Sequence, residues 1–339
     1  MESIDRIALI GINRPERRNA IDKRTAKLLI ELFKDFEKNS TLDVAVLYGK
    51  GGNFCSGFDM KELAKSPDEM KTLIEECLRT KTRPLGPTLK QFEKPVIAAV
   101  NGYAVAGGLE LALMCDLRIV EETAILGMYN RRFDIPMTDG GSVRLPKMIG
   151  LSRALDLIIT GRQINGKIAF DWGLANRIVD TGTALGQAMN LARIIGTLPK
   201  TSLLYDRNSV YYSTFESCNF EDAMQFELRN ANNAITSGTW QKDEINCLAL
   251  FFLKSYWKCW KMNKNDNSFL AFMIIVFLLL IKMMVCIGNT FNNRSSVFVV
   301  WIDDEKFHIF PPREEQLVRS TCLTAAALWN KNVETICPN

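Results

Sequence analysis

The first 245 residues of this 339-residue chain are predicted to form an α/β fold, because short apolar runs alternate with helical stretches. Three runs, at residues 7–11, 44–48 and 96–100, are apolar almost throughout and are followed by turn-forming glycine, asparagine or proline. Continuous apolar runs of this kind are typical of strands that are covered on both faces.

Helices are expected between these strands. Asp22 is a good N-cap for a helix that reaches about Phe36. Its apolar side chains recur three or four residues apart, at Ala26, Leu29, Leu32, Phe33 and Phe36. A second helix is expected from Gly107 to about Met114, followed by a strand at residues 117–120. The alternation of strands and helices indicates one α/β domain.

Composition argues against several classes of function. The chain is 47% hydrophobic and 24% charged, with a net charge of +4 and no basic patch interleaved with aromatics, so no nucleic-acid partner is expected. The single histidine, His308, lies outside the first 245 residues. We therefore expect no Ser-His-Asp or Cys-His pair and no His-ligated metal there, and proton transfer must come from carboxylates, tyrosine or lysine.

Cysteine usage and the N-terminal residues bear on location. The nine cysteines contain no Cys-x-x-Cys pair, and the N-terminal residues resemble neither a signal peptide nor an Arg-rich transit peptide. We expect reduced thiols and a cytoplasmic protein, while an organellar location stays open.

Residues 246–339 differ in character and are interpreted as a separate tail. Residues 269–281 are apolar at every position, and the apolar stretch continues to residue 287 with only Lys282 intervening. Its length, 269–287, is near that needed to cross a bilayer. Three interpretations stay open for the tail: a membrane anchor that leaves the first domain cytosolic, translated non-coding sequence, or a buried helix of a soluble protein.

Two glycine-containing turns are the segments most suited to chemistry. Residues 53–60 follow a buried strand, and residues 101–111 place glycines where a helix begins. Taken singly, each is also explained as an ordinary turn or helix start. Together, two such turns can each offer one backbone N–H to the same carbonyl oxygen. A thioester carbonyl that gains enolate charge requires such a pair of donors.

Four motifs resemble the crotonase, or enoyl-CoA hydratase/isomerase, superfamily: Asn13-Arg14-Pro15 with Asn19-Ala20-Ile21, Phe54–Met60, Asn101–Leu111 and Cys115–Arg118. The resemblance covers about residues 5–240. It implies a crotonase-type spiral of ββα turns with a helical C-terminal trimerisation region, in a homotrimer or a hexamer. It also implies an acyl-CoA thioester substrate, with no cofactor or metal beyond the coenzyme A of the substrate itself.

The resemblance also implies roles for individual residues. Phe58 and Gly107 are expected to supply the N–H groups of the oxyanion hole. Coenzyme A is expected along the segment that contains or adjoins Cys55, Ser56, Gly57, Asp59, Lys61 and Gly108. For Cys55 simple packing is an alternative role, and for Lys61 a solvated surface position is one.

Three further positions decide the reaction. Glu110 follows Gly107 by nearly one helical turn and is expected to be catalytic, although it could also be a partner of the helix dipole. Asn130 occupies the position that the resemblance gives to the second glutamate of hydratases, and an amide exchanges no proton there. Asp139 is expected to serve as a second acid/base; its alternative role is the N-cap of a helix that begins near Gly141.

The leading hypothesis is therefore an acyl-CoA hydratase or isomerase that stabilises a thioester enolate. Asn130 argues against a straightforward hydratase. Two alternatives remain: a CoA-thioester hydrolase or decarboxylase of the same fold, and an acyl-CoA-binding protein without catalytic activity.

Overall fold

The structure is a computed structural model that describes residues 1–64, 68–237, 299–303 and 306–310. The chain divides into two units, Met1–Cys247 and Leu248–Asn339, and each is considered by itself. The apolar segment 269–287 lies outside the described residues. Among the helices that are described, none is both long and apolar enough to cross a membrane.

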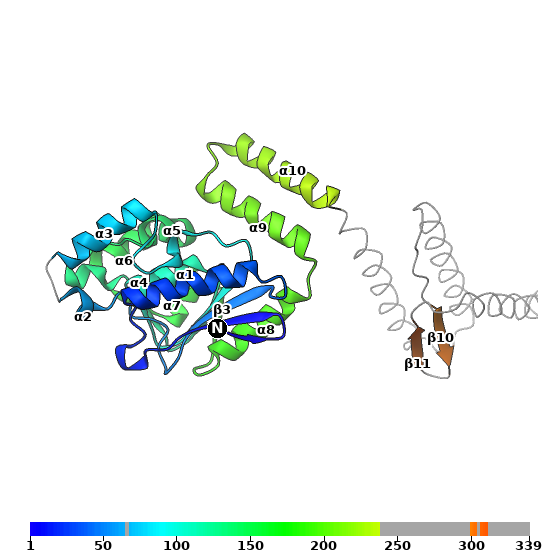
Figure 1. Cartoon of the computed structure of the whole chain (residues 1–339), viewed down its shortest axis with the longest axis horizontal. Coiled ribbons are helices and arrows are strands. Elements are labelled where there is room, and N and C mark those ends of the chain that lie inside the picture. Colours follow the sequence, from blue (N-terminus) through cyan, green and yellow to red (C-terminus); the bar gives the residue numbers. More distant parts are fainter. Residues whose placement is uncertain (65–67, 238–298, 304–305, 311–339) are drawn as a thin grey trace, which may run out of the picture. The chain divides into compact units, whose positions relative to one another are not determined.

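The first unit contains strands of two sheets and a set of α- and 3-10 helices (Figure 1). The strands are β1 (Glu2–Ile4), β2 (Ile7–Ile12), β3 (Val44–Gly49), β4 (Val96–Val100), β5 (Tyr103–Val105), β6 (Leu117–Glu121), β7 (Ile125–Gly127), β8 (Gln163–Asn165) and β9 (Arg177–Val179). The α-helices are α1 (Lys23–Lys38), α2 (Met60–Leu63), α3 (Glu69–Thr80), α4 (Gly107–Met114), α5 (Gly141–Ile149), α6 (Leu151–Thr160), α7 (Gly166–Asp171), α8 (Ala184–Gly196), α9 (Lys200–Phe215) and α10 (Phe220–Thr236). The 3-10 helices are η1 (Pro15–Arg17), η2 (Pro87–Leu89) and η3 (Tyr129–Phe133).

In the second unit, the described residues form one antiparallel pair, β10 (Val299–Asp303) with β11 (Lys306–Phe310).

The larger sheet has the order β1-β2-β3-β4-β6-β9. Only β1 runs antiparallel to its neighbour, and the other five strands are parallel. Successive side chains point to opposite faces: Val46 packs beneath α8, while Leu47 enters the main core on the other side. The prediction of strands that are buried on both faces is confirmed at β2, β3 and β4.

Helix α1 forms where its cap and periodicity predict. The Asp22 carboxylate accepts a hydrogen bond from Thr25 N at 2.7 Å, and the helix buries Ala26, Leu29, Phe33 and Phe36. Because this apolar stripe covers the face of the sheet opposite α8, the sheet lies between two helical layers.

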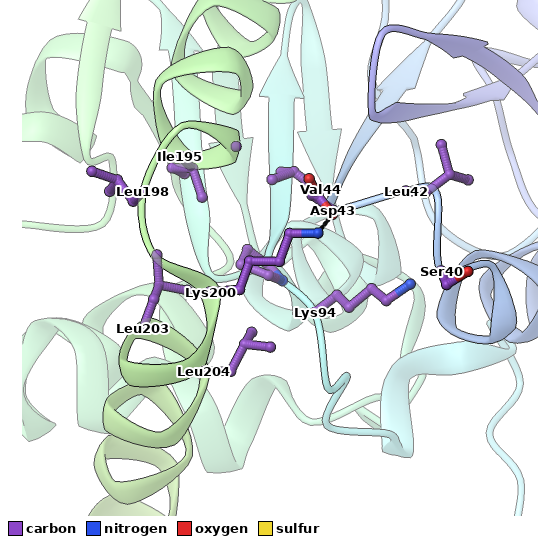
Figure 2. A pocket seen from close by; sticks show the side chains of 12 residues that line it. Ser40, Leu42, Asp43, Val44, Lys94, Ile195, Leu198, Lys200, Leu203 and Leu204 are labelled. Atoms are coloured by element: carbon purple, nitrogen blue, oxygen red, sulfur yellow. Dashed lines mark ion pairs between the residues drawn. The ribbon is translucent and has the colours of Figure 1, made fainter. Parts of the chain in front are cut away.

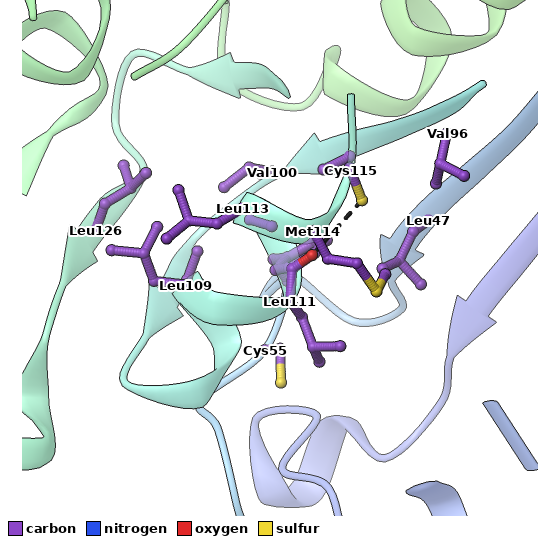
Figure 3. Packing of buried hydrophobic residues seen from close by; sticks show 14 of the residues in the cluster. Leu47, Cys55, Val96, Val100, Leu109, Leu111, Leu113, Met114, Cys115 and Leu126 are labelled. Carbon is purple, nitrogen blue, oxygen red and sulfur yellow. Dashed lines mark hydrogen bonds between the residues drawn. The ribbon is translucent and has the colours of Figure 1, made fainter. Parts of the chain in front are cut away.

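Helix α4 lies inside the core, and all 8 of its residues are buried (Figure 3). Leu109 and Leu113 lie on one side of the helix and Leu111 points to another, and each belongs to the main cluster of buried apolar side chains. A helix that is apolar around its whole circumference has no solvent face. It packs against the smaller sheet, which has the order β5-β7-β8, and against α5.

The buried guanidinium of Arg118 satisfies the carbonyl end of α4. It donates to the carbonyl oxygens of Ala112, Cys115 and Asp116 at 3.4, 2.7 and 3.3 Å, and to Leu174 O at 2.7 Å. A cation is favourable at the negative end of a helix dipole, and its donors pair carbonyls that the last turn leaves free.

The expected helical C-terminal region consists of α9 and α10, which pack side by side (Figure 1). Asp116 anchors α9, since its Oδ1 accepts hydrogen bonds from Arg207 Nε and from the Tyr211 hydroxyl, both at 2.7 Å. Its Oδ2 accepts from Val96 N at 2.7 Å, which connects the helix directly to the start of β4.

A cavity of about 70 Å³ lies at the junction of α8 and α9 (Figure 2). Asp43 is buried in its wall and pairs with Lys200 at the start of α9 and with Arg6 near β2. Burial alone would raise the pKa of Asp43, but hydrogen bonds and charges from these two cations lower it. The lining contains none of the residues that the sequence singles out for catalysis, so we interpret the cavity as part of the α9 attachment.

Candidate active site

The two glycine-containing turns that the sequence singles out lie side by side. Cys55 N donates to Tyr103 O at 2.9 Å and Val105 N donates to Cys55 O at 3.1 Å, which forms a short parallel bridge between Cys55 and Ala104. Residues far apart in the sequence are thereby brought to the beginning of α4.

Gly57 and Gly107 are in direct contact at this junction. Gly57 has φ +96°, and a Cβ atom placed on it would lie 2.9 Å from Gly107 N. Only glycine combines that backbone conformation with so close an approach. Among the described residues, the amides of Phe58 and Gly107 donate no hydrogen bond, so two free N–H groups lie beside this contact.

Asn19 holds the start of the turn at residues 53–60 in place. It is fully buried with φ +56°, and its Nδ2 donates to Lys50 O at 2.8 Å and to Asn53 O at 2.6 Å. Its Oδ1 accepts from Arg14 N at 2.8 Å. The guanidinium of Arg14 in turn pairs with Asp59 at 2.9 Å, just after Phe58. The motif residues near the N-terminus therefore fix the loop that carries Phe58.

Glu110 is buried at 1% exposure, and its carboxylate reaches the beginning of a different helix. Its Oε1 accepts hydrogen bonds from Asp139 N at 3.0 Å and from Gly141 N, the first residue of α5, at 2.8 Å. Oε2 accepts none from the residues that the structure describes. Burial and the charge of Asp139 raise the pKa of Glu110 to about 7, although the two amides and Arg144 oppose the shift.

Asp139 lies next to Glu110, and both of its carboxylate oxygens are occupied. Oδ1 accepts from Leu85 N at 3.1 Å and from the Thr88 hydroxyl at 2.5 Å, and Oδ2 accepts from the Thr138 hydroxyl at 2.7 Å. Burial raises its pKa, while these hydrogen bonds and Arg83 oppose the rise. The alternative role as an N-cap is wrong, because Gly140 is the N-cap of α5 and the side chain of Asp139 donates or accepts nothing there.

Asn130 is buried in η3 at 8% exposure, and its Oδ1 has no hydrogen-bond partner in the described part of the chain. A buried amide oxygen without a partner is rare in folded proteins.

A family model described as enoyl-CoA hydratase/isomerase matches residues 2–242. The chain belongs to this family. The (E)-benzylidenesuccinyl-CoA hydratase of Thauera aromatica is 34% identical over 204 residues, which cover 60% of this chain and 78% of that protein. The short-chain-enoyl-CoA hydratase of Clostridium acetobutylicum is 29% identical over 228 residues, covering 67% of this chain and 85% of that protein.

The fold agrees with family membership. The crystal structure of the enoyl-CoA hydratase EchA1 from Mycobacterium marinum matches with a TM-score of 0.67 at 29% identity, over 73% of this chain and 94% of that one. The crotonase-type α/β fold expected from the motifs is confirmed. As a member of the enoyl-CoA hydratase/isomerase family, the chain is an acyl-CoA hydratase or isomerase.

The residues expected along coenzyme A lie in different environments within this family member. The Cys55 thiol is fully buried, which raises its pKa to about 12. Gly108 packs against the backbone of Cys55, so closely that a Cβ atom on Gly108 would lie 1.9 Å from Cys55 O. Asp59 is also buried and accepts from Lys61 N at 3.1 Å as the cap of α2. Ser56 is half-buried, and the side chain of Lys61 is exposed.

Several residues that hold Asp139 in place were not predicted from the sequence. Thr88 and Leu85 carry no motif, and they are 51 and 54 residues from Asp139 in sequence. Arg144 donates to Asp139 O at 3.1 Å and to Thr88 O at 2.6 Å, which joins the same two segments. Asn19 is different, because it belongs to a motif that the sequence shows, although the motif does not indicate which residues it contacts.

Proposed function

We propose that this enzyme shifts a double bond along an acyl-CoA thioester, using Glu110 as the only proton carrier. The thioester oxygen would accept hydrogen bonds from Phe58 N–H and Gly107 N–H. Glu110 would remove a proton from Cα, and the C–H electron pair would become the enolate held by these two donors. Return of the same proton to Cγ would restore the thioester carbonyl and move the double bond next to it.

The observation that carries this proposal is the asymmetry of the carboxyl groups. Glu110 has one oxygen held by amides and one left for a reacting proton, and its pKa of about 7 suits proton exchange near neutrality. Asp139 has both oxygens occupied, and Asn130 exchanges no proton. A shift of one proton needs one such group, whereas hydration by two acid/base residues needs a second.

Coenzyme A is proposed to enter only as part of the substrate and to lie along residues 55–61, where the exposed Lys61 can meet its phosphates. The chemistry then consists of proton transfer and hydrogen bonding. Hydration of a 2-enoyl-CoA is the second candidate, because the relatives from Thauera aromatica and Clostridium acetobutylicum are both named as hydratases.

The full chain should convert 3-enoyl-CoA thioesters to their 2-enoyl isomers without a net change in mass. A panel of 2-enoyl and 3-enoyl substrates in deuterated and in ¹⁸O-labelled water, read by mass spectrometry, tests this. Formation of the 2-enoyl isomer without uptake of ¹⁸O supports isomerisation, with deuterium entering at Cγ only as far as Glu110 exchanges its proton with the solvent; uptake of one labelled water supports hydration instead. Release of free coenzyme A or CO₂ would show a hydrolase or decarboxylase, and binding without any turnover would overturn an enzymatic role.

We also propose a homotrimer, or a hexamer built from two trimers, that uses α9 and α10. Large apolar side chains are exposed on this helix pair: Val210, Phe220, Met224, Leu228 and Ile235. Monomeric proteins rarely expose so many apolar residues together, and closed symmetric assemblies are the common way to cover them.

Leu228→Glu should dissociate this assembly, because it places a charge where the proposed interface is apolar. Light scattering coupled to gel filtration should give an oligomer for the unmodified chain and a smaller species for the variant. Gln225→Glu is the matched control, since it adds the same charge to an exposed position of α10. A monomeric unmodified chain, or an intact Leu228→Glu oligomer, would contradict the proposal.

A further inference from the structure

Asp139 forms a junction between three segments that surround the proposed proton carrier. Its carboxylate accepts hydrogen bonds from Leu85, just before η2, and from Thr88, within η2. Its amide donates to Glu110 Oε1, and its carbonyl accepts from Arg144 of α5. Each polar group of this one residue therefore holds a different part of the site.

The same junction reaches the proposed oxyanion hole. The Leu85 side chain packs against Gly107, where a Cβ on the glycine would lie 2.5 Å from Leu85 Cδ1. Leu85 N is one of the donors to Asp139. A loss of the Asp139 carboxylate would therefore loosen both the wall beside Gly107 and the amide that holds Glu110.

We propose that Asp139 is a positioning residue that acts through Glu110: its carboxylate fastens the residue 85–88 segment beside α5, and its negative charge disfavours a second charge on Glu110. This inference rests on the proposed role of Glu110 as proton carrier. It assigns no proton exchange with the substrate to Asp139, because hydrogen bonds from Leu85 N and from the Thr88 and Thr138 hydroxyls favour its ionised form.

The charges around Glu110 and Asp139 are consistent with a positioning role for Asp139. Burial is the larger cause of the raised pKa of Glu110, and the charge of Asp139 adds to it, while Arg144 from α5 opposes both. Arg83 faces Asp139 and favours its ionised form, and the thiol of Cys77 on α3 also lies within its field. Arg144 also interacts with Asp139, so it faces both carboxyl groups.

Asp139→Asn tests the charge, because the amide has nearly the same shape and its oxygen can still accept from Leu85 N. In the active full chain, proton removal by Glu110 makes kcat/KM rise with pH through the pKa of that group. The variant should shift this rise to lower pH by about one unit, with a loss of about tenfold at the plateau. Asp134→Asn is the matched control, since it removes the same charge from an exposed position of the same loop, and its profile should not move.

An unmoved profile, or a loss of 10²-fold or more at every pH as expected for removal of a general acid or base, would overturn the proposal. Thr88→Val gives a second test that keeps the charge and nearly the volume. It should lower kcat/KM several-fold with the pH profile in place, and an unchanged kcat/KM would overturn the fastening role. Failure of the proposed function is recognised separately, because Glu110→Gln would then retain the activity of the unmodified chain.

Discussion

Gly57→Ala should lower kcat/KM by about 10²–10³-fold, which is the usual effect of losing one oxyanion donor. The new Cβ would lie 2.9 Å from Gly107 N and 3.3 Å from Ala106 Cβ, so the two turns must separate. Separation moves the Phe58 and Gly107 amides out of reach of a single oxygen. Steady-state kinetics on whichever enoyl-CoA substrate turns over would measure the loss, which should appear mainly in kcat.

Gly52→Ala is the control for backbone strain. Gly52 has φ +90°, close to the +96° of Gly57, but a Cβ on it would have no neighbour within 4 Å. Both variants should lose about 1–2 kcal/mol of unfolding free energy from the positive φ. Only Gly57→Ala should lose activity, and equal kinetics for the two variants would contradict the assignment of the oxyanion hole.

Glu110→Gln should reduce kcat/KM by about 10³-fold, the middle of the range for removal of a general acid or base. The amide oxygen can still accept from Asp139 N and Gly141 N, so the fold should be retained. Measurement on the same enoyl-CoA substrate checks the loss. Glu76→Gln, at an exposed position of α3, should leave the rate unchanged.

The same variant should be more stable than the unmodified chain at alkaline pH. The pKa of Glu110 is raised from 4.5 to about 7 in the folded protein, so folding favours the protonated form. Its contribution to stability is complete below about pH 4.5 and is lost as pH rises through about 7. Denaturant unfolding at pH 8 should therefore show a gain on the order of 3 kcal/mol for Glu110→Gln, and little difference at pH 4.5. A gain that did not depend on pH would contradict the raised pKa.

Local signals were sufficient for most of the regular structure. The Asp22 cap and the apolar stripe predicted α1 within two residues of its end, and the glycine-opened segment predicted α4 correctly at both ends. The strands of the larger sheet were predicted where apolar runs were long. The three-residue strands β1, β5, β7 and β8 were not, because so short a segment has too few residues to show a period.

The sequence predicts which elements carry the residues of the candidate site, but not the contacts that these residues make. The motifs predicted correctly that Phe58 lies in a turn and that Gly107 and Glu110 lie at the start of a helix. They could do so because the neighbouring glycines indicate the backbone conformation at these positions. The role of Asp139 as an N-cap was the natural local interpretation, and it is wrong because the Glu110 carboxylate, 31 residues before Gly141 in sequence, accepts from the first amide of α5 instead. Contacts of this range depend on packing, which no local pattern contains.

Helix α4 limits how new substrate preferences can arise in this protein. Its 8 residues are all buried, and they include both Gly107 and Glu110. A substitution of the proposed proton carrier Glu110 or of the proposed oxyanion donor Gly107 would therefore also disturb the packing of the core, and selection for stability would remove most such variants. The half-buried Phe58 and the partly exposed η3 segment have more freedom to vary. Inherited diversity among proteins of this kind should thus accumulate at these two places, while the residues of α4 persist.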